Sequence, residues 1–124
     1  MGGFDESLIR LEDTDYCFRV QRAGQPLSFA PGAVVHIRDR PGFSTFFMRS
    51  VLWSRDAALL YKRYANGATL DRPWRNHLYA WRSVLLDAWR IRRREDFLAW
   101  TWRFGCQVGV LIGTVVHRSP PVPL

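Results

Sequence analysis

The stretch Glu12-Asp13-Thr14-Asp15 opens a short amphipathic segment and lies in the most acidic part of this 124-residue chain. Five of the eleven acidic residues fall within the first fifteen positions, where Arg10 is the only basic residue. Carboxylates this close together repel one another unless a metal ion or a helix N-terminus lies nearby. The acidic stretch is therefore the first candidate for a functional site.

The residues around this stretch predict one short helix followed by extended segments. A helix is expected from Asp13, whose carboxylate can cap the first free N–H groups, to Gly24, which favours a helix end. Residues 27–30 and 33–38 are short, β-prone runs separated by Pro31-Gly32. They predict either a hairpin or one bent extended segment.

Past residue 41 the apolar spacing changes to that of helices, and three long helices are expected. The first should end at Asn66-Gly67, the second should begin after Asp71, and the third should cover residues 95–116. The residues expected to face inward in the first helix are Phe46, Trp53, Ala57, Leu60 and Tyr64. Those expected to face inward in the second are Trp74, Leu78, Trp81, Leu85 and Trp89.

The third predicted helix approaches transmembrane length, because residues 97–116 contain a single charge. Arg103 lies well inside this stretch, and an arginine at the centre of a span costs about 2.5–3.5 kcal/mol. Gly105, Gly109 and Gly113 repeat every four residues, which permits close contact with another helix. An interfacial or protein-packed helix is therefore favoured over a membrane span.

Charge is divided unevenly along the chain. Residues 1–40 carry a net charge of −1, whereas residues 41–124 carry +8 and all six tryptophans. Seventeen of the eighteen basic residues are arginine, which pairs bidentately with phosphate and stacks on aromatic rings. The second part thus favours an anionic partner, which could be lipid headgroups, nucleic acid or a phosphorylated substrate. No recognisable nucleic-acid motif accompanies the charge, so nucleic acid is not an expected partner.

Two interpretations of the acidic stretch follow from the residues alone. In the structural one, Asp13 caps the helix, Asp15 pairs with Arg19 one turn later, and Glu12 is solvated. In the functional one, His36 ends the apolar run 33–35 and ligates a divalent metal, with a nearby carboxylate as general base. Asp13 and Asp15 point to different sides of a helix, so the pair alone makes no metal clamp.

Several short motifs follow one another within about the first forty positions. They are Gly2-Gly3-Phe4-Asp5-Glu6, Glu12-Asp13-x-Asp15 with Arg19, Arg22-Ala23-Gly24, and Phe29-Ala30-Pro31 with Ala33-Val34-Val35-His36. Their order and spacing resemble the acceptor-side half of the catalytic domain of family 2 glycosyltransferases.

This resemblance implies a GT-A type domain that transfers a sugar, with inversion, from a nucleotide-sugar donor to an acceptor hydroxyl. It implies that Asp13 is the general base, that Glu12 positions the acceptor, and that His36 binds a manganese or magnesium ion. Asp15 and Arg19 are further candidates for substrate contact. The acceptor would be a glycan or a lipid-linked molecule in cell-envelope synthesis. The enzyme would be cytoplasmic, with peripheral attachment to the cytoplasmic face of the membrane.

The family's first half, which contains the nucleotide-binding strands, has no counterpart in these residues, so no cofactor-binding residue is expected here. The resemblance therefore implies a truncated or split enzyme that is inactive by itself. The predicted fold class is an α/β fragment. It comprises a partial GT-A domain at residues 1–40 with one short helix and one or two strands, a helical extension at 41–118 and an extended tail at 119–124. The alternative function is a non-enzymatic basic helical module that binds an anionic membrane, nucleic acid or a protein.

Overall fold

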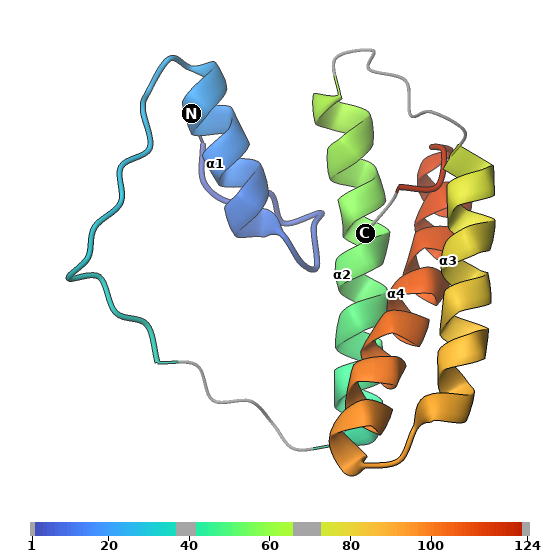
Figure 1. Ribbon diagram of the computed structural model, residues 1–124. Coiled ribbons are helices and arrows are strands. Elements are labelled where there is room, and N and C mark those ends of the chain that lie inside the picture. Colours follow the sequence, from blue (N-terminus) through green and yellow to red (C-terminus); the bar gives the residue numbers. More distant parts are fainter. Residues whose placement is uncertain (1, 37–41, 66–72, 123–124) are drawn as a thin grey trace.

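The computed structural model describes residues 2–36, 42–65 and 73–122. Within these ranges the chain forms four α-helices and one 3-10 turn (Figure 1). They are α1 (Glu12–Arg22), α2 (Phe43–Tyr64), α3 (Pro73–Asp87), η1 (Ala88–Arg90) and α4 (Arg94–His117). Helices α2 and α4 run in the same direction, and α3, which connects them in sequence, runs in the opposite direction. Helix α1 lies on the other side of α2.

The core of the molecule is the contact between α2 and α4. The three glycines of α4 face α2, and a Cβ added to Gly113 would lie 2.8 Å from the Cβ of Ala58. A Cβ on Gly109 would lie 2.8 Å from the Cβ of Ser54 and closer still to the carbonyl oxygen of Val51. No side chain fits in these gaps, so the two backbones approach closely. The close helix contact predicted from the glycine spacing is confirmed.

Helix α3 packs on α4 through His77, Trp81 and Val84, of which only Trp81 was predicted to face inward. His77 and Val84 are buried, and the indole of Trp81 lies edge-on to the ring of Phe104 at 5.6 Å between centroids. The Nε1 of Trp100 donates a hydrogen bond of 2.8 Å to the carbonyl oxygen of Val84. These contacts leave the opposite face of α3 exposed.

The predicted inward stripe of α3 is therefore wrong in four of its five members. Trp74, Leu78, Leu85 and Trp89 are each more than half exposed, and only Trp81 turns toward α4. Both faces of α3 carry apolar residues at helical spacing, so periodicity does not tell which one is inside. The smaller face fits against the large rings of α4.

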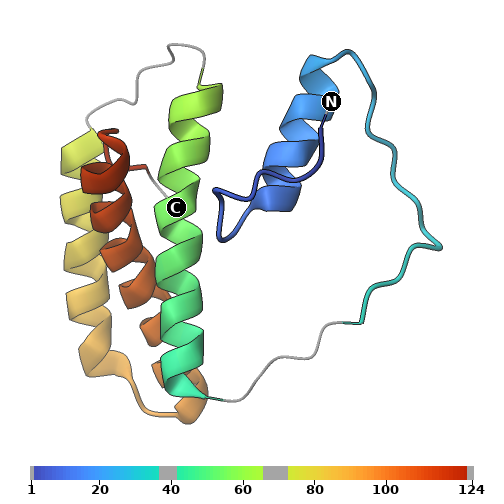
Figure 2. The same ribbon diagram turned by 180° about the vertical axis from the view of Figure 1, so that it is seen from behind.

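The α/β fold class is wrong, because the described residues contain helices and no strand. The β-prone residues 27–30 and 33–36 are exposed and run outward from the helices and back toward α2 (Figure 2). A strand exists only when its backbone groups pair with a neighbour, and no other described segment offers one. Residues 37 and 38 of the second run lie outside the described ranges, as do Asn66-Gly67 and Asp71.

The ends of α4 are well defined. The carboxylate of Asp96 accepts hydrogen bonds from the backbone N–H groups of Arg92 at 3.1 Å and Arg93 at 2.9 Å, which satisfies free donors at the helix start. Beyond the helix, Ser119 and Pro121 are buried.

No helix among the described residues is both long enough and apolar enough to cross a membrane.

Candidate functional site

The acidic N-terminal segment is held against α2 by a buried carboxylate of that helix. Asp56 is 1% exposed, and its Oδ2 accepts hydrogen bonds from the backbone N–H groups of Ile9 at 2.9 Å and Arg10 at 2.8 Å. Its Oδ1 accepts one from Arg55 at 2.8 Å. Both oxygens of a buried carboxylate are thus bonded, which is what burial of a charge requires. These bonds fix the loop that leads into α1.

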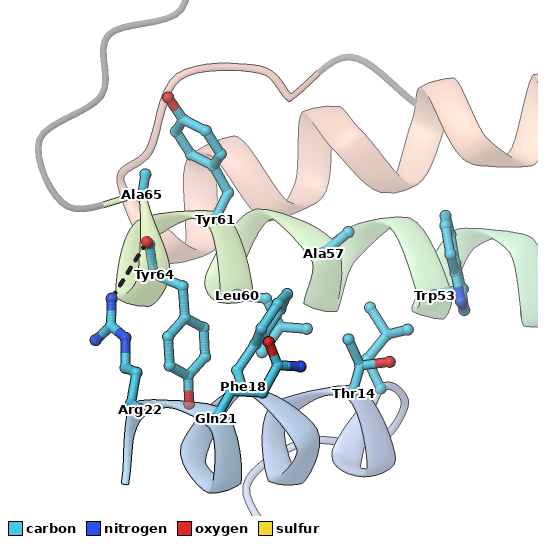
Figure 3. A pocket seen from close by; sticks show the side chains of 11 residues that line it. Thr14, Phe18, Gln21, Arg22, Trp53, Ala57, Leu60, Tyr61, Tyr64 and Ala65 are labelled. Atoms are coloured by element: carbon cyan, nitrogen blue, oxygen red, sulfur yellow. Dashed lines mark hydrogen bonds between the residues drawn. The ribbon is translucent and has the colours of Figure 1, made fainter. Parts of the chain in front are cut away.

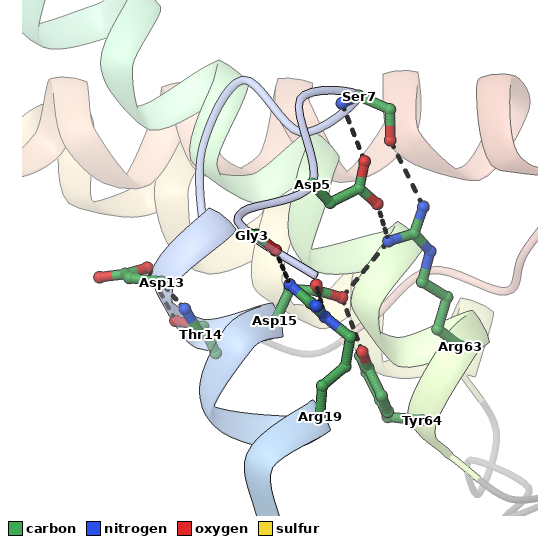
Figure 4. A network of polar contacts seen from close by, with 9 residues as sticks. All are labelled: Gly3, Asp5, Ser7, Asp13, Thr14, Asp15, Arg19, Arg63 and Tyr64. Carbon is green, nitrogen blue, oxygen red and sulfur yellow. Dashed lines mark hydrogen bonds and ion pairs between the residues drawn. The ribbon is translucent and has the colours of Figure 1, made fainter. Parts of the chain in front are cut away.

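The second anchor is Asp15, which lies at the centre of a polar network (Figure 4). Its Oδ2 accepts a hydrogen bond of 2.8 Å from the Nε of Arg19, and its Oδ1 accepts one of 2.7 Å from the hydroxyl of Tyr64. Arg63 donates to the same Oδ1 at 3.3 Å and to Asp5 at 2.5 Å. One cation of α2 therefore bridges the loop and α1.

Protonation states in this network follow from its geometry. Hydrogen bonds from Ser7, followed by the bond and charge of Arg63, lower the pKa of Asp5 to about 2. Burial acts to raise the pKa of Asp15, but the hydrogen bonds from Tyr64 and Arg19 and the positive charges of Arg19 and Arg63 outweigh it and bring this pKa below its usual range. Both carboxylates are ionised at neutral pH, so the network is a stable set of charge pairs.

The position of Asp15 and Arg19 agrees with the structural interpretation of these two residues. Asp15 is buried and both its oxygens are engaged, and Arg19 also donates a 2.7 Å hydrogen bond to the carbonyl oxygen of Gly3. Their contacts serve to hold α1 in place. Their predicted role in substrate contact remains a prediction.

Asp13 lies on the opposite side of α1 and is exposed. Its Oδ1 accepts hydrogen bonds from the backbone N–H of Thr14 at 2.7 Å and from the Thr14 hydroxyl at 3.3 Å. The expected N-cap role of Asp13 is wrong, because α1 begins one residue earlier, at Glu12, after Leu11 in a left-handed conformation with φ 63°. Glu12 itself is half-buried in the first turn.

His36 is exposed on the extended segment that follows α1. Among the described residues, no three His, Cys, Asp or Glu side chains come together in a way that could hold a metal ion. This finding does not test the predicted manganese or magnesium ion, because His36 is the only one of its expected ligands assigned by residue. A site built on His36 needs further ligands from elsewhere, and the ion remains a prediction.

An apolar groove of about 640 Å³ separates α1 from α2 (Figure 3). Its walls include Phe18 of α1 and Trp53, Ala57 and Leu60 of α2. The face of α2 predicted to point inward thus contributes largely to this groove. At one end, the guanidinium of Arg22 lies 4.7 Å over the ring of Tyr64 and donates to its carbonyl oxygen at 3.3 Å.

Thr14 connects the groove with the exposed carboxylate. Its side chain is part of the groove lining, while its backbone N–H and hydroxyl bind Asp13. Asp13 itself is not part of the groove lining, so Thr14 is the residue that touches both the groove and this carboxylate.

Sequence reasoning missed Asp56 and Arg63 of α2, which hold this region, and it placed Tyr64 on the inward face of the helix without its hydrogen bond to Asp15. A signal for Asp56 was present, because it is the only acidic residue between positions 40 and 70. A lone acid in a basic, apolar helix is seldom buried without bonded partners. The partners of Asp56 are backbone amides, and a sequence pattern does not reveal these.

Comparisons with known proteins add no assignment. No protein-family model matches the chain, and neither a curated protein nor a solved structure gives a significant match.

Proposed function

We propose that this chain contributes the acceptor side of a glycosyltransferase, with Asp13 as the general base. The reaction would be inverting transfer of a sugar from a nucleotide-sugar to an acceptor hydroxyl, at the cytoplasmic face of the membrane. The observation that carries the proposal is the different environment of the two neighbouring aspartates. Asp15 is buried in ion pairs, whereas Asp13 is exposed at the start of α1, where the motif resemblance locates the base.

The chemistry needs an ionised carboxylate with a free oxygen. Thr14 directs both its hydrogen bonds to Oδ1 of Asp13, and Oδ2 would face the acceptor. As the acceptor oxygen attacks the anomeric carbon, its O–H bond breaks and the proton passes to Oδ2. The bond from the anomeric carbon to the nucleoside diphosphate breaks, and its electron pair leaves with the diphosphate. Glu12, one residue earlier, would hold the acceptor sugar.

The groove supports a lipid-linked acceptor over a free glycan. Phe18, Trp53 and Leu60 make the groove apolar. Binding a hydrocarbon chain there is favourable because it removes apolar surface from water. Thr14 lies in its wall, directly beside the proposed base. A lipid tail in the groove would bring the attached sugar within reach of Asp13.

The test is made in the source cell, where any further part of the enzyme is present. The genomic copy receives Asp13→Asn, and incorporation of labelled sugar into envelope glycans and glycolipids is measured. Removal of a general base should lower transfer by about 10²-fold or more at an unchanged protein level. Glu95→Gln is the control, because Glu95 is exposed at the distant start of α4. Full incorporation with Asp13→Asn would refute the proposal.

A further inference from the structure

The outer face of α3 and the η1 turn that follows it carry an exposed apolar stripe. Trp74, Leu78, Leu85 and Trp89 follow one another at helical spacing, and all are more than half exposed, with Leu78 at 66% and Trp89 at 85%. Between its ends this stripe is about 22 Å long, at 1.5 Å per residue. Exposed apolar residues that occur singly are ordinary, but a continuous helical stripe marks a binding surface.

This face is turned outward by contacts on the other side of the helix. Arg103 of α4 donates hydrogen bonds to Asp87 at 2.5 Å and to the hydroxyl of Ser83 at 2.9 Å. Together with buried His77 and Val84, these bonds fix the rotation of α3. Both ribbon views place α3 at the outer edge of the molecule, with α4 on one side (Figures 1 and 2). The stripe is thus available to a partner.

The charge next to the stripe identifies the kind of partner. Residues 73–94 contain six arginines, Arg75, Arg82, Arg90, Arg92, Arg93 and Arg94, and a single acid. That acid, Asp87, is paired with Arg103 and with Arg90 at 3.2 Å, and the hydrogen bond of Arg103 holds its pKa below the usual range. The surface beside the stripe is therefore strongly positive.

We propose that the outer face of α3 (Trp74, Leu78 and Leu85), together with Trp89 of η1 and the arginines that flank them, binds the surface of an anionic lipid bilayer. Tryptophan settles at the headgroup layer, leucine enters the acyl boundary, and arginine binds lipid phosphate. An anionic bilayer has a binding environment for all three residue types, whereas nucleic acid has no hydrocarbon layer into which the leucines could insert. Helix α3 lies in the plane of the membrane, and the molecule attaches without crossing it.

The test is vesicle flotation of the full chain. The probes are phosphatidylcholine vesicles with about one third phosphatidylglycerol, and phosphatidylcholine alone. The chain should bind the anionic vesicles and bind the neutral ones at least about 10-fold more weakly. Equal binding to both, or no binding to either, overturns the proposal.

Two variants with equal numbers of substitutions locate the surface. Leu78→Ser, Leu85→Ser and Trp89→Ser together should weaken vesicle binding by about 10-fold or more. The control combines Phe29→Ser, Val34→Ser and Val35→Ser, which alters three exposed apolar residues of the segment after α1. It should bind as the parent does, and unchanged binding by the α3 variant contradicts the inference. Circular dichroism verifies that both variants keep their helices.

Two other occupants of the stripe give distinct results. If a second copy of the chain covers it, analytical ultracentrifugation shows a dimer that the α3 variant loses, and vesicles do not bind. If nucleic acid covers it, a single-stranded oligonucleotide binds and competes with vesicles. Either result overturns the membrane proposal. None of these measurements depends on Asp13, so they stand apart from the sugar-transfer experiment.

Discussion

Gly109 is the position where one added methyl group should affect the fold most directly. In Gly109→Ala, the new Cβ would lie 2.8 Å from the Cβ of Ser54 and closer to the Val51 carbonyl oxygen. Ordinary carbon contacts are about 3.5–4.0 Å. The Val51 oxygen belongs to the backbone of α2 and has no rotamer to change. The two helices must therefore separate by about 1 Å, the difference between these contact distances.

The expected cost follows from this separation. Overpacking of this kind destabilises a core by about 1–3 kcal/mol, and the higher helix propensity of alanine returns up to about 1 kcal/mol. The net loss in free energy of unfolding should be about 1–2 kcal/mol, which corresponds to a decrease in Tm of roughly 4–8 °C for a chain of this size.

The assay is thermal and urea unfolding followed by circular dichroism at the helix band. Gly32→Ala is the matched control, since a Cβ there meets nothing within 4 Å, and it should leave the midpoint unchanged. A Gly109→Ala variant as stable as the parent would mean that α2 and α4 do not approach closely at this point.

Three further predictions concern the anchors of α1 and α3. Tyr64→Phe removes the 2.7 Å hydrogen bond to Asp15. It should make hydrogen exchange of the α1 amides about fivefold faster, equivalent to about 1 kcal/mol. The control Tyr79→Phe, at an exposed ring, should leave these exchange rates unchanged. The pKa values of Asp5 and Asp15 are lowered on folding. The docking of α1 should therefore be complete above pH 3.8, the ordinary pKa of an aspartate, and be lost as the pH falls toward about 2. Hydrogen-exchange rates of α1 that stay constant over this range would contradict the network. Burial lowers the pKa of His77 below 6.5. The free energy of unfolding should therefore be constant above pH 6.5 and decrease below it. Urea titrations of His77→Gln should show a smaller decrease in the free energy of unfolding over the same pH range.

The helical part of the fold was largely predictable from sequence. Apolar spacing located the three long helices. The four-residue glycine repeat predicted that the last helix can approach another helix closely, but it did not identify α2 as the partner. The inward face of α3 was not predictable. The predicted stripe with Trp74 and Leu78 and the buried pair His77 and Val84 both recur at helical spacing, and only the packing against α4 decides between them.

The candidate site was predictable where it depends on spacing within one helix. The pair Asp15 and Arg19 follows from one helical turn, and helical spacing also places Asp13 and Asp15 on different sides of the helix. The strands expected after α1 were wrong because strand formation depends on a partner that local sequence does not contain. The hydrogen bond from Tyr64 to Asp15 joins residues 49 positions apart. A pattern within one short stretch of sequence cannot predict such a contact.

The contact of Asp56 with the loop before α1 has a consequence for how that loop can vary. The carboxylate binds the N–H groups of Ile9 and Arg10 and touches neither side chain through these bonds. Most substitutions at both positions therefore preserve the anchor. Proline is the exception, because it has no N–H to donate. The loop can change its surface chemistry through evolution or design while α1 stays in place, as long as proline is kept out of these two positions.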